Sequence, residues 1–469
     1  MVQNSALSVD WVIDNVPPDV WRHIFGFLDL KSYEGYRVED GDVVRLSHVC
    51  CLWRDVVNNS PELWTEVDLY VSPMVMRPGI GLLSRILHNS RDMPLVMSLE
   101  IHGNSTAPSN LINDACQLFF REVLRAEHLD LRIYGQTPLQ GIEAEIQGGL
   151  MLQSLCINIP YEDEGIMSVV SKLWSPAPSL QSLILAHIGH GFPLKNIGFL
   201  QAHNFPFQQV TDLEVEFDIH LDVICRLVPL MPSLAFVTLN GVLDARELIN
   251  PLERPSIQDL TLEGCQCGFP HPSMQLLDFA LSPSLTSLWL KRGHQCSAYS
   301  SLRFFKRILR KSLSCLEHLY FDFTPSTDEE KIDCLKLLPC LRTLDLTAKS
   351  YRHARSEFGS QFCDAMQEWD RSTQTFALCP QLEKLVINHE TLEHTASAIF
   401  AEMIEERWMR YMAAGQTFEV KIINVGERLH DAEMVDDIMH IQALKKSGLR
   451  VTIKPNDWLK RYFYQRCLI

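Results

Sequence analysis

One short phrase recurs along most of this chain and limits how it can fold. Its form is Pro-x-Leu/Ile-x-x-Leu/Val-x-Leu/Ile, and copies with the proline begin at Pro178, Pro232, Pro255, Pro283, Pro339 and Pro380. Copies without the proline lie at 152–157, 210–215 and 316–321, and weaker ones at 97–101 and 128–131. A phrase repeated this often indicates one structural unit stacked many times.

The spacing of the copies identifies the kind of repeat. The marker residues are the central apolar positions Leu99, Leu129, Leu155, Leu183, Leu213, Val237, Leu260, Leu288, Leu319, Leu344 and Leu385. Successive markers lie 23 to 31 residues apart, except for a last step of 41. Leucine-rich repeats have periods of about 20–29 residues, so the array matches them with a slight stretch. The long last step contains a polar segment, 350–361, which we expect to loop out.

The phrase predicts a β-strand, because Leu-x-Leu has the two-residue period that places both leucines on one side. The preceding proline removes a backbone donor and belongs just before the strand. Segments 163–174, 300–313 and 328–338 have helical spacing. The predicted fold class is α/β, a solenoid with a parallel sheet inside and helices outside. A doubly wound α/β domain is the alternative, but it would not repeat one strand phrase.

The region before the repeats predicts a small all-α module. An amphipathic helix opens at Pro18 and runs to Leu28. A second helix is predicted after Asp42, where apolar residues recur at spacings of three and four: Val43, Leu46, Val49, Cys50, Trp53, Val56 and Val57. Two short helices cannot bury this much apolar surface against each other. They need the first repeats or another protein.

These residues resemble a known family. Segment 16–20, Val-Pro-Pro-Asp-Val, with Ile24-Phe25 and Leu28, resembles the first half of an F-box, usually Leu-Pro-x-Glu-Leu/Ile followed by Ile-Phe and Leu. Segment 46–54, LSHVCCLWR, resembles its second half, and 60–69, SPELWTEVDL, is similar to the segment that follows in many mushroom-type (basidiomycete) fungal F-box proteins. Val16 and Asp19 depart mildly from the pattern. The polar residues 32–41 are extra, since family members usually have a tight turn there.

The resemblance implies a docking function. F-box proteins bind the Skp adaptor of a cullin-based SCF ubiquitin ligase through apolar residues of the helical module. Carried over by motif position, the adaptor-binding residues are Pro17, Pro18, Val20, Ile24, Leu28, Val49 and Trp53. For Val49 and Trp53 the alternative is a place in the core, since a tryptophan at helical spacing is usually buried.

Composition excludes several other classes. A net charge of −16 over 469 residues argues against a nucleic-acid binder, because phosphate contacts need a basic face. No apolar run approaches the ~18 residues of a membrane span, and the N-terminus does not resemble a signal peptide. The 14 cysteines are scattered, and several lie in apolar patterns, as buried thiols do. We therefore expect an intracellular protein, cytoplasmic or nuclear, without nucleic-acid or membrane partners.

No motif for catalysis, a cofactor or a metal emerges. Phosphate-binding glycine loops of the Walker type are absent from the sequence. The pair Cys265 and Cys267 lacks a second half for zinc, and His389 and His394 are spaced i, i+5 rather than i, i+4. In the family the ubiquitin chemistry belongs to other subunits. The expectation is a protein that is not an enzyme, with no catalytic residue, cofactor or metal.

The strand phrase also predicts where a client protein binds. The residue between the two leucines points away from the core, which gives Cys156, Ile184, Glu214, Thr238, Thr261, Trp289, Tyr320, Asp345 and Val386. Trp289 and Tyr320 fall on neighbouring repeats, so we expect them roughly 5 Å apart across the ladder. Lys291 and Asp322 follow two residues later. The predicted client-binding set is Trp289, Lys291, Tyr320, Asp322 and Asp345; alternatively, a loop or the C-terminal segment covers this face.

The sequence thus predicts three regions: an F-box at 12–65, leucine-rich repeats at 66–390, and C-terminal repeats with a capping segment at 391–469. The leading hypothesis is a substrate-recognition subunit of an SCF-type ligase, with the F-box on the Skp adaptor and the repeats on a client. The alternative is an interaction scaffold that does not promote degradation.

Overall fold

The computed structural model of the chain is divided into two compact units. Unit 1 comprises residues 1–192 and 196–210, and unit 2 comprises 193–195 and 211–469. The structure describes residues 16–27, 42–72, 75–102, 109–134, 148–158, 170–186, 200, 204–216, 219–240, 242–243, 257–263, 284–291, 315–321, 327–346, 359–388, 399–425 and 432–455.

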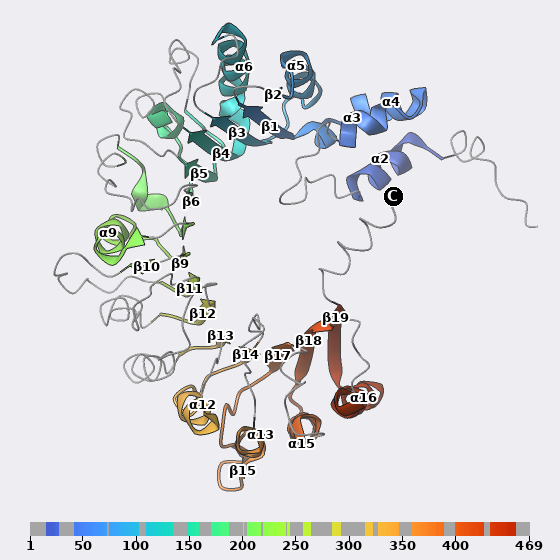
Figure 1. Ribbon diagram of the computed structural model, residues 1–469, viewed down its shortest axis with the longest axis vertical. Coiled ribbons are helices and arrows are strands. Elements are labelled where there is room, and N and C mark those ends of the chain that lie inside the picture. Colours follow the sequence, from blue (N-terminus) through green and yellow to red (C-terminus); the bar gives the residue numbers. More distant parts are fainter. Residues whose placement is uncertain are drawn as a thin grey trace, which may run out of the picture. The chain divides into compact units, whose positions relative to one another are not determined.

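Unit 1 begins with helices and continues into a sheet (Figure 1). Its helical elements are α2 (Pro18–Phe27), α3 (Asp42–Ser47), α4 (Cys51–Asn58), η1 (Pro61–Trp64), α5 (Ile80–Asn89), α6 (Ser109–Arg121), η2 (Glu122–Arg125), η4 (Lys172–Trp174) and η5 (Phe207–Gln209). Its strands are β1 (Glu66–Val71), β2 (Met76–Arg77), β3 (Leu95–His102), β4 (Ala126–Tyr134), β5 (Ser154–Asn158) and β6 (Ser182–Leu185). The strand order is β2-β1-β3-β4-β5-β6, parallel except for the short antiparallel β2.

Unit 2 begins with a strand and continues the alternation of parallel strands and helices. Its strands are β7 (Asp212–Val215), β8 (Ile219–His220), β9 (Phe236–Leu239), β10 (Val242–Leu243), β11 (Asp259–Glu263), β12 (Ser287–Lys291), β13 (His318–Phe321), β14 (Thr343–Leu346), β15 (Trp369–Asp370), β16 (Thr375–Phe376), β17 (Lys384–Asn388), β18 (Glu419–Val425) and β19 (Arg450–Pro455). Its helical elements are α9 (Leu221–Leu227), η6 (Val228–Leu230), α12 (Asp328–Leu335), α13 (Ser360–Gln367), α15 (Ile399–Ala413) and α16 (Ala432–Lys446). The main ladder runs β7-β9-β11-β12-β13-β14-β17-β18-β19.

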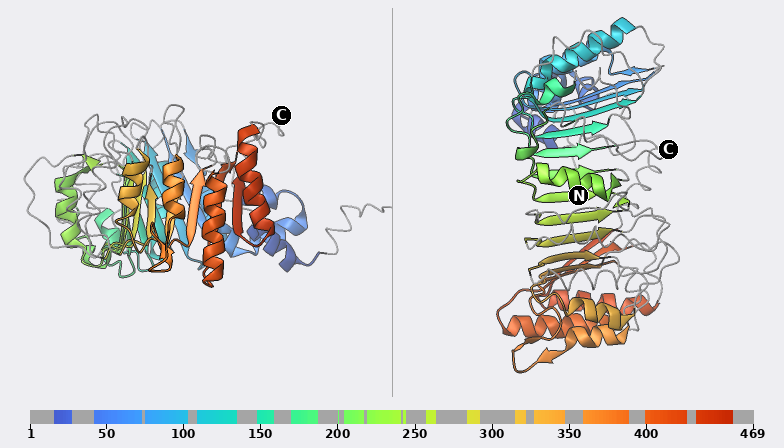
Figure 2. Two further views of the ribbon diagram at one scale, coloured as in Figure 1. Left: turned by 90° about the horizontal axis from the view of Figure 1, so that it is seen from below. Right: turned by 90° about the vertical axis from the view of Figure 1, so that its left-hand side faces the viewer.

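The register of the unit 2 ladder follows the sequence phrase residue by residue. The paired markers are Leu213, Val237, Leu260, Leu288, Leu319, Leu344 and Leu385, and Val420 and Val451 extend the row. All of these side chains are buried. Helices α12, α13, α15 and α16 cover that side of the ladder (Figures 1 and 2). The α/β solenoid with a parallel sheet inside and helices outside is confirmed.

In unit 1 the predicted first marker, Leu99, lies two residues beyond the position that is in register with the second marker. Leu129 pairs with Met97, whereas Leu99 pairs with Leu131. The strands of this part are longer, with eight residues in β3 and nine in β4. The four apolar residues of β3 at period 2, Leu95, Met97, Leu99 and Ile101, satisfy the phrase in more than one position, so the weak copy at 97–101 does not fix the register.

Two further predictions need correction. The second helix of the N-terminal module is broken into α3 and α4, because Cys50 adopts an extended backbone (φ −156°) and its Sγ accepts a hydrogen bond from the Trp53 amide at 3.4 Å. The prediction that segment 350–361 loops out is wrong at the C-terminal end of the segment. Its last two residues instead open α13, whose Phe362, Cys363 and Met366 are buried, and the rest lies outside the described residues apart from Gly359.

Polar side chains of one repeat cap the helix of a neighbouring repeat. The Asp328 carboxylate in α12 accepts the backbone amides of Gly359 and Phe362, each at 3.1 Å, where α13 begins. In α16, the buried Asp437 accepts the amide of Ala401 at 2.8 Å, in the first turn of α15. The first amides of a helix have no partner within it, so these carboxylates satisfy groups that would otherwise be buried and unpaired.

Arg407 is the largest fully buried side chain in the described part of unit 2. It lies in α15, and its Nε donates to the Met366 carbonyl at 2.7 Å. Its other nitrogens donate to the carbonyls of Cys379, at 3.3 Å, and Leu378. Phe376 stacks beneath the guanidinium, 4.3 Å from its carbon to the ring centroid. Backbone carbonyls and a ring face thus replace the carboxylate that a buried cation usually requires.

Candidate functional site

The helical module at the start of unit 1 has its own core. That core consists of Trp21, Phe25, Val56, Val57 and Trp64. The two α2 residues are four apart and lie on one helix face, as the amphipathic pattern requires. The Trp64 indole N–H donates to the Val57 carbonyl at 2.8 Å, which fixes η1 against α4. Aromatic and aliphatic packing therefore holds α2, α4 and η1 together.

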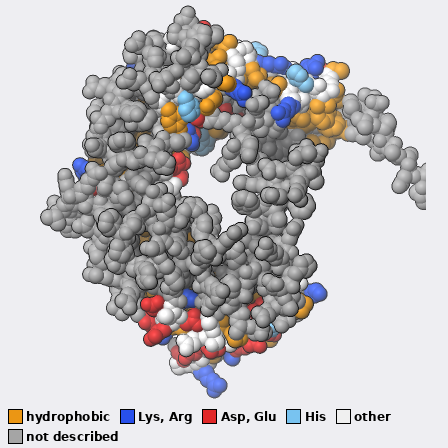
Figure 3. All heavy atoms as spheres, in the orientation of Figure 1, with side chains coloured by type: hydrophobic (Ala, Val, Ile, Leu, Met, Phe, Trp, Pro, Cys, Tyr) orange, Lys and Arg blue, Asp and Glu red, His pale blue; other side chains and the backbone are white. Residues whose placement is uncertain are grey.

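Apolar side chains nevertheless remain exposed on the outside of this core. Val20 is 45% exposed, Ile24 40% and Val49 58%. Val20 and Ile24 lie one helical turn apart on α2, next to the buried face, and Val49 occupies the turn between α3 and α4. We name these three residues the module patch. Figure 3 shows hydrophobic side chains gathered at the surface of this region.

The predicted adaptor residues divide into three groups. Pro17 and Pro18 are exposed at the start of α2, along with the module patch. Trp53 is half-buried, with its ring centroid 5.0 Å from that of Trp21 and 4.9 Å from that of Phe25. It packs at the edge of the core. Leu28 lies outside the described residues.

The module is joined to the first repeat by direct packing. Only Thr65 separates η1 from β1. Ile86 of α5 packs against the module core, and Arg85 donates to the Asn58 side chain at 3.0 Å. The Arg85 guanidinium also lies over the Trp64 ring, 5.9 Å from the centroid. The first repeat thus buries part of the apolar surface of the two predicted helices. This was one of the two predicted ways to cover that surface, the other being a second protein.

The opposite face of the unit 2 ladder, which we name the open face, carries the variable positions of the phrase. The register pairs Glu214, Thr238, Thr261, Trp289, Tyr320, Asp345 and Val386 in one row, and Lys421 and Thr452 extend it. In unit 1, Cys156 pairs with Ile184 in the same way. The predicted alignment of these positions is confirmed. Cys156 and Val386 are buried rather than exposed.

Trp289 and Tyr320 stack on neighbouring strands. Their ring centroids are 5.1 Å apart with an interplanar angle of 17°, close to the spacing that the strand geometry predicts. The Trp289 indole N–H donates to Ser287 Oγ at 2.9 Å, which holds the ring along its own strand. Both side chains are only partly buried. The ladder therefore presents a preoriented aromatic surface.

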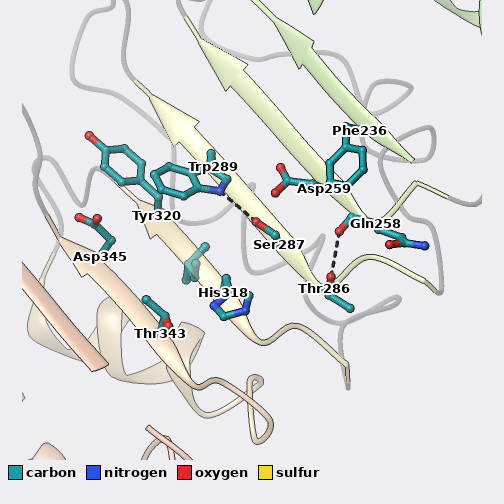
Figure 4. Close-up of a pocket in the computed structure, with 11 residues that line it drawn as sticks. Phe236, Gln258, Asp259, Thr286, Ser287, Trp289, His318, Tyr320, Thr343 and Asp345 are labelled. Carbon is teal, nitrogen blue, oxygen red and sulfur yellow. Dashed lines mark hydrogen bonds between the residues drawn. The ribbon is translucent and has the colours of Figure 1, made fainter. Parts of the chain in front are cut away.

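A pocket of about 330 Å³ surrounds this pair on the open face (Figure 4). We name it the aromatic pocket. Its lining residues are Phe236, Gln258, Asp259, Thr286, Ser287, Trp289, His318, Leu319, Tyr320, Thr343 and Asp345. The pocket brings together three of the five predicted client residues, Trp289, Tyr320 and Asp345. The side chain of Lys291 and the whole of Asp322 lie outside the described residues.

Sequence reasoning missed half of this pocket. Phe236, Asp259, Ser287, His318 and Thr343 form a second row in register, two residues before the first. The two-residue period of a strand places them on the same face as Trp289 and Tyr320. The signal was present in each copy of the phrase, at the position just before the marker leucine.

The part of the chain that the structure describes contains no cluster of three or more histidine, cysteine or acidic residues able to hold a metal ion. No helix within those residues has the length and apolar character needed to cross a membrane.

Comparison with known proteins identifies one region of the chain. Among solved structures, the chain is similar to the leucine-rich repeat-containing protein LegL7 from Legionella pneumophila. The TM-score is 0.38 and the sequence identity 13%, and the match covers 66% of this chain and 95% of that one. No curated protein matches the sequence. Residues 13–70, which hold the module core and the module patch, match the F-box-like family. The chain therefore carries an F-box-like domain at its N-terminus.

Proposed function

We propose that this protein is a substrate-recognition subunit of an SCF-type cullin ubiquitin ligase. Its F-box-like domain binds a Skp adaptor, and its repeats bind a client protein that becomes ubiquitinated. The chain supplies no catalytic residue, cofactor or metal to this reaction, and the ubiquitin transfer belongs to the other subunits. We expect the protein to lie in the cytoplasm or the nucleus, where the ligase acts. From segment 60–69 we also predict that it is related to the mushroom-type fungal F-box proteins.

The observation that carries the adaptor assignment is the module patch. Val20, Ile24 and Val49 are exposed although the core beside them is complete without them. A single exposed apolar residue is ordinary, but three around one small helical module that matches the F-box-like family favour a protein interface. F-box domains in general bind Skp-type adaptors, so a Skp adaptor is the partner that this surface fits.

The test is capture of a purified Skp adaptor by the full-length chain. Replacing Val20 and Ile24 by glutamate places two charges where the adaptor would exclude water. A buried unpaired charge costs several kcal/mol, so we expect the adaptor affinity to fall by at least about a hundredfold. Both positions are exposed, so the fold of unit 1 should survive, as circular dichroism can verify.

A matched control uses exposed apolar residues elsewhere. Met409 and Met412 of α15 are 51% and 54% exposed, and their replacement by glutamate should leave adaptor capture unchanged. Wild-type chain that does not bind the adaptor, or a Val20→Glu, Ile24→Glu variant that binds it as well as wild type does, contradicts the assignment.

The competing function is a scaffold that binds partners without promoting degradation. A reconstituted ligase that contains the adaptor, the cullin, its RING subunit and an E2 separates the two. A substrate receptor should yield ubiquitin chains on a bound client, or on itself, that disappear with the Val20→Glu, Ile24→Glu variant. A scaffold would bind the adaptor or its partners and yield none.

A further inference from the structure

The open face of unit 2 is acidic around the aromatic pocket. From β7 to β14 its two rows contain four carboxylates, and no lysine or arginine stands at any of these described positions. The two rows consist of Asp212, Glu214, Phe236, Thr238, Asp259, Thr261, Ser287, Trp289, His318, Tyr320, Thr343 and Asp345. Lys291 of β12 lies two residues beyond Trp289, where it pairs in register with the acidic Glu263 of β11. The other lysines and arginines in register, Lys384, Lys421 and Arg450, lie on β17 to β19. A ligand that enters the pocket therefore meets negative charge.

Two of the carboxylates flank the aromatic pair. Asp259 lies on β11, next to the strand that carries Trp289, and Asp345 lies on β14, next to the strand that carries Tyr320. Figure 4 shows Trp289 between Tyr320 and Asp259, with Asp345 beyond Tyr320. Since each ring uses one face in the stack, the other face is directed toward a strand that carries a carboxylate. An aromatic face beside a carboxylate attracts a cation twice, through the ring quadrupole and through the charge.

We propose that the aromatic pocket binds an arginine side chain of the client protein. The guanidinium stacks on Trp289 or Tyr320 and donates hydrogen bonds to the Asp259 or Asp345 carboxylate. This inference rests on the proposed function, since it names the kind of client segment that the repeats recognise. A volume of about 330 Å³ is at the low end for ligand pockets, which suits one long side chain and its neighbours.

Arginine fits this arrangement better than the other candidates. An acidic side chain would face like charges on both sides of the aromatic pair. A purely apolar side chain would take the carboxylates away from water and offer them neither charge nor donor of its own, which costs free energy. Lysine supplies the charge, but its compact ammonium cannot stack as a plane or donate a pair of parallel hydrogen bonds to one carboxylate. Only a planar cation uses the ring face and the carboxylate together.

The test is a selection of random linear peptides displayed on phage, with the full-length chain as bait. The pocket should enrich arginine at one position over lysine, glutamate and leucine. The tightest peptide is then remade with citrulline, which keeps the shape of arginine without its charge. We expect wild-type protein to bind the citrulline peptide about tenfold to a hundredfold more weakly, from the loss of a charged hydrogen bond and a cation–π contact.

Variants of the chain locate the preference. Asp259→Asn combined with Asp345→Asn should abolish the difference between the arginine and citrulline peptides, and Trp289→Leu should reduce it. The matched control is Asp212→Asn, on β7 of the same face, which should keep the full difference. Recovery of no peptide, no arginine enrichment among the recovered peptides, or equal binding of the citrulline peptide overturns the proposal without any variant.

Adaptor capture by the same preparations separates this inference from the proposed function. Preparations that capture the Skp adaptor but show no arginine preference overturn the pocket assignment alone. Preparations that prefer arginine peptides but ignore the adaptor overturn the ligase assignment and leave the pocket as the recognition site of a scaffold.

Discussion

Replacement of Arg407 by methionine probes the packing of the later repeats. The guanidinium is fully buried and donates to the carbonyls of Met366, Leu378 and Cys379, which connect α13 and the turn before β17 to α15. Burial lowers the pKa of Arg407, and the neighbouring Tyr411 opposes that shift. Arginine titrates so far above neutrality that it remains charged. Methionine fills most of the volume but donates nothing.

The expected loss follows from the three carbonyls. A buried acceptor left without a donor costs about 1–3 kcal/mol, although carbonyls that still meet other groups lie at the low end. Three acceptors, together with the lost contact with the Phe376 ring, give about 3–5 kcal/mol. Removal of the charge itself is favourable, because a buried cation is poorly solvated, and this offsets part of the loss. We expect a net destabilisation of about 3 kcal/mol.

The assay is urea unfolding followed by tryptophan fluorescence, with hydrogen exchange to locate the change in α13 and α15. A loss of about 3 kcal/mol corresponds to a melting temperature lower by roughly 6–12 °C in a unit of this size. Arg410→Met is the matched control, one helical turn along α15. Arg410 is half exposed and pairs with Glu406 at 2.7 Å, and exposed pairs contribute at most about 1 kcal/mol.

A change below about 1 kcal/mol in Arg407→Met would refute this reasoning. It would mean that other donors satisfy the three carbonyls, or that α13 does not depend on α15. Equal losses from Arg407→Met and Arg410→Met would also contradict it, since they would assign the effect to charge and not to buried hydrogen bonds.

Two further predictions concern other buried groups. Asp437→Ala leaves the Ala401 amide of α15 unpaired, so unfolding experiments should show a loss of about 1–2 kcal/mol, and a loss near zero would contradict the capping role. Burial raises the pKa of the Cys379 and Cys363 thiols from an ordinary 9.0 to about 12, so both stay protonated at pH 9. Mass spectrometry after brief iodoacetamide treatment at pH 9 should find the exposed Cys51 and Cys315 alkylated and the two buried thiols intact; alkylation of Cys379 in folded protein would contradict its burial.

Much of the architecture could be predicted because the strand phrase states its own register. Each marker in unit 2 is found opposite the next, and Trp289 and Tyr320 stack at the spacing that the phrase implies. The phrase failed where its copies are weak. The long strand β3 has several apolar residues at period 2, so the phrase favours Leu99 at the position that Met97 occupies.

Other features depend on tertiary context that the local pattern does not carry. Residue types in helix α12 favour Ile332 as a core position, yet Lys331 is 1% exposed and Ile332 only half-buried. The Lys331 ammonium lies 3.4 Å from Asp328, the carboxylate that also caps α13. Burial of a lysine is expected only where a charged partner and packing on several sides offset the loss of hydration. The spacing of apolar residues along the helix does not reveal such a partner.

Among the candidate site residues, the exposure of Val49 and of Trp53 also depends on structure that the local pattern does not predict. Both fit the amphipathic spacing, but the break at Cys50 turns Val49 outward and leaves Trp53 against Trp21 and Phe25. A cysteine at the start of a helix is an uncommon cap, since serine, threonine, asparagine and aspartate are preferred. The break between α3 and α4 is therefore hard to predict from residue types alone.

The packed junction between the helical module and the first repeat has a mechanical consequence. A domain joined to its neighbour by a flexible linker can adopt many orientations relative to that neighbour. Here the helical module packs directly on the first repeat, through contacts of Trp64 with Arg85 and of the module core with Ile86. A single residue separates η1 from β1. Because the junction is packed, a protein that held the helical module would also set the direction in which the first strands of the array run.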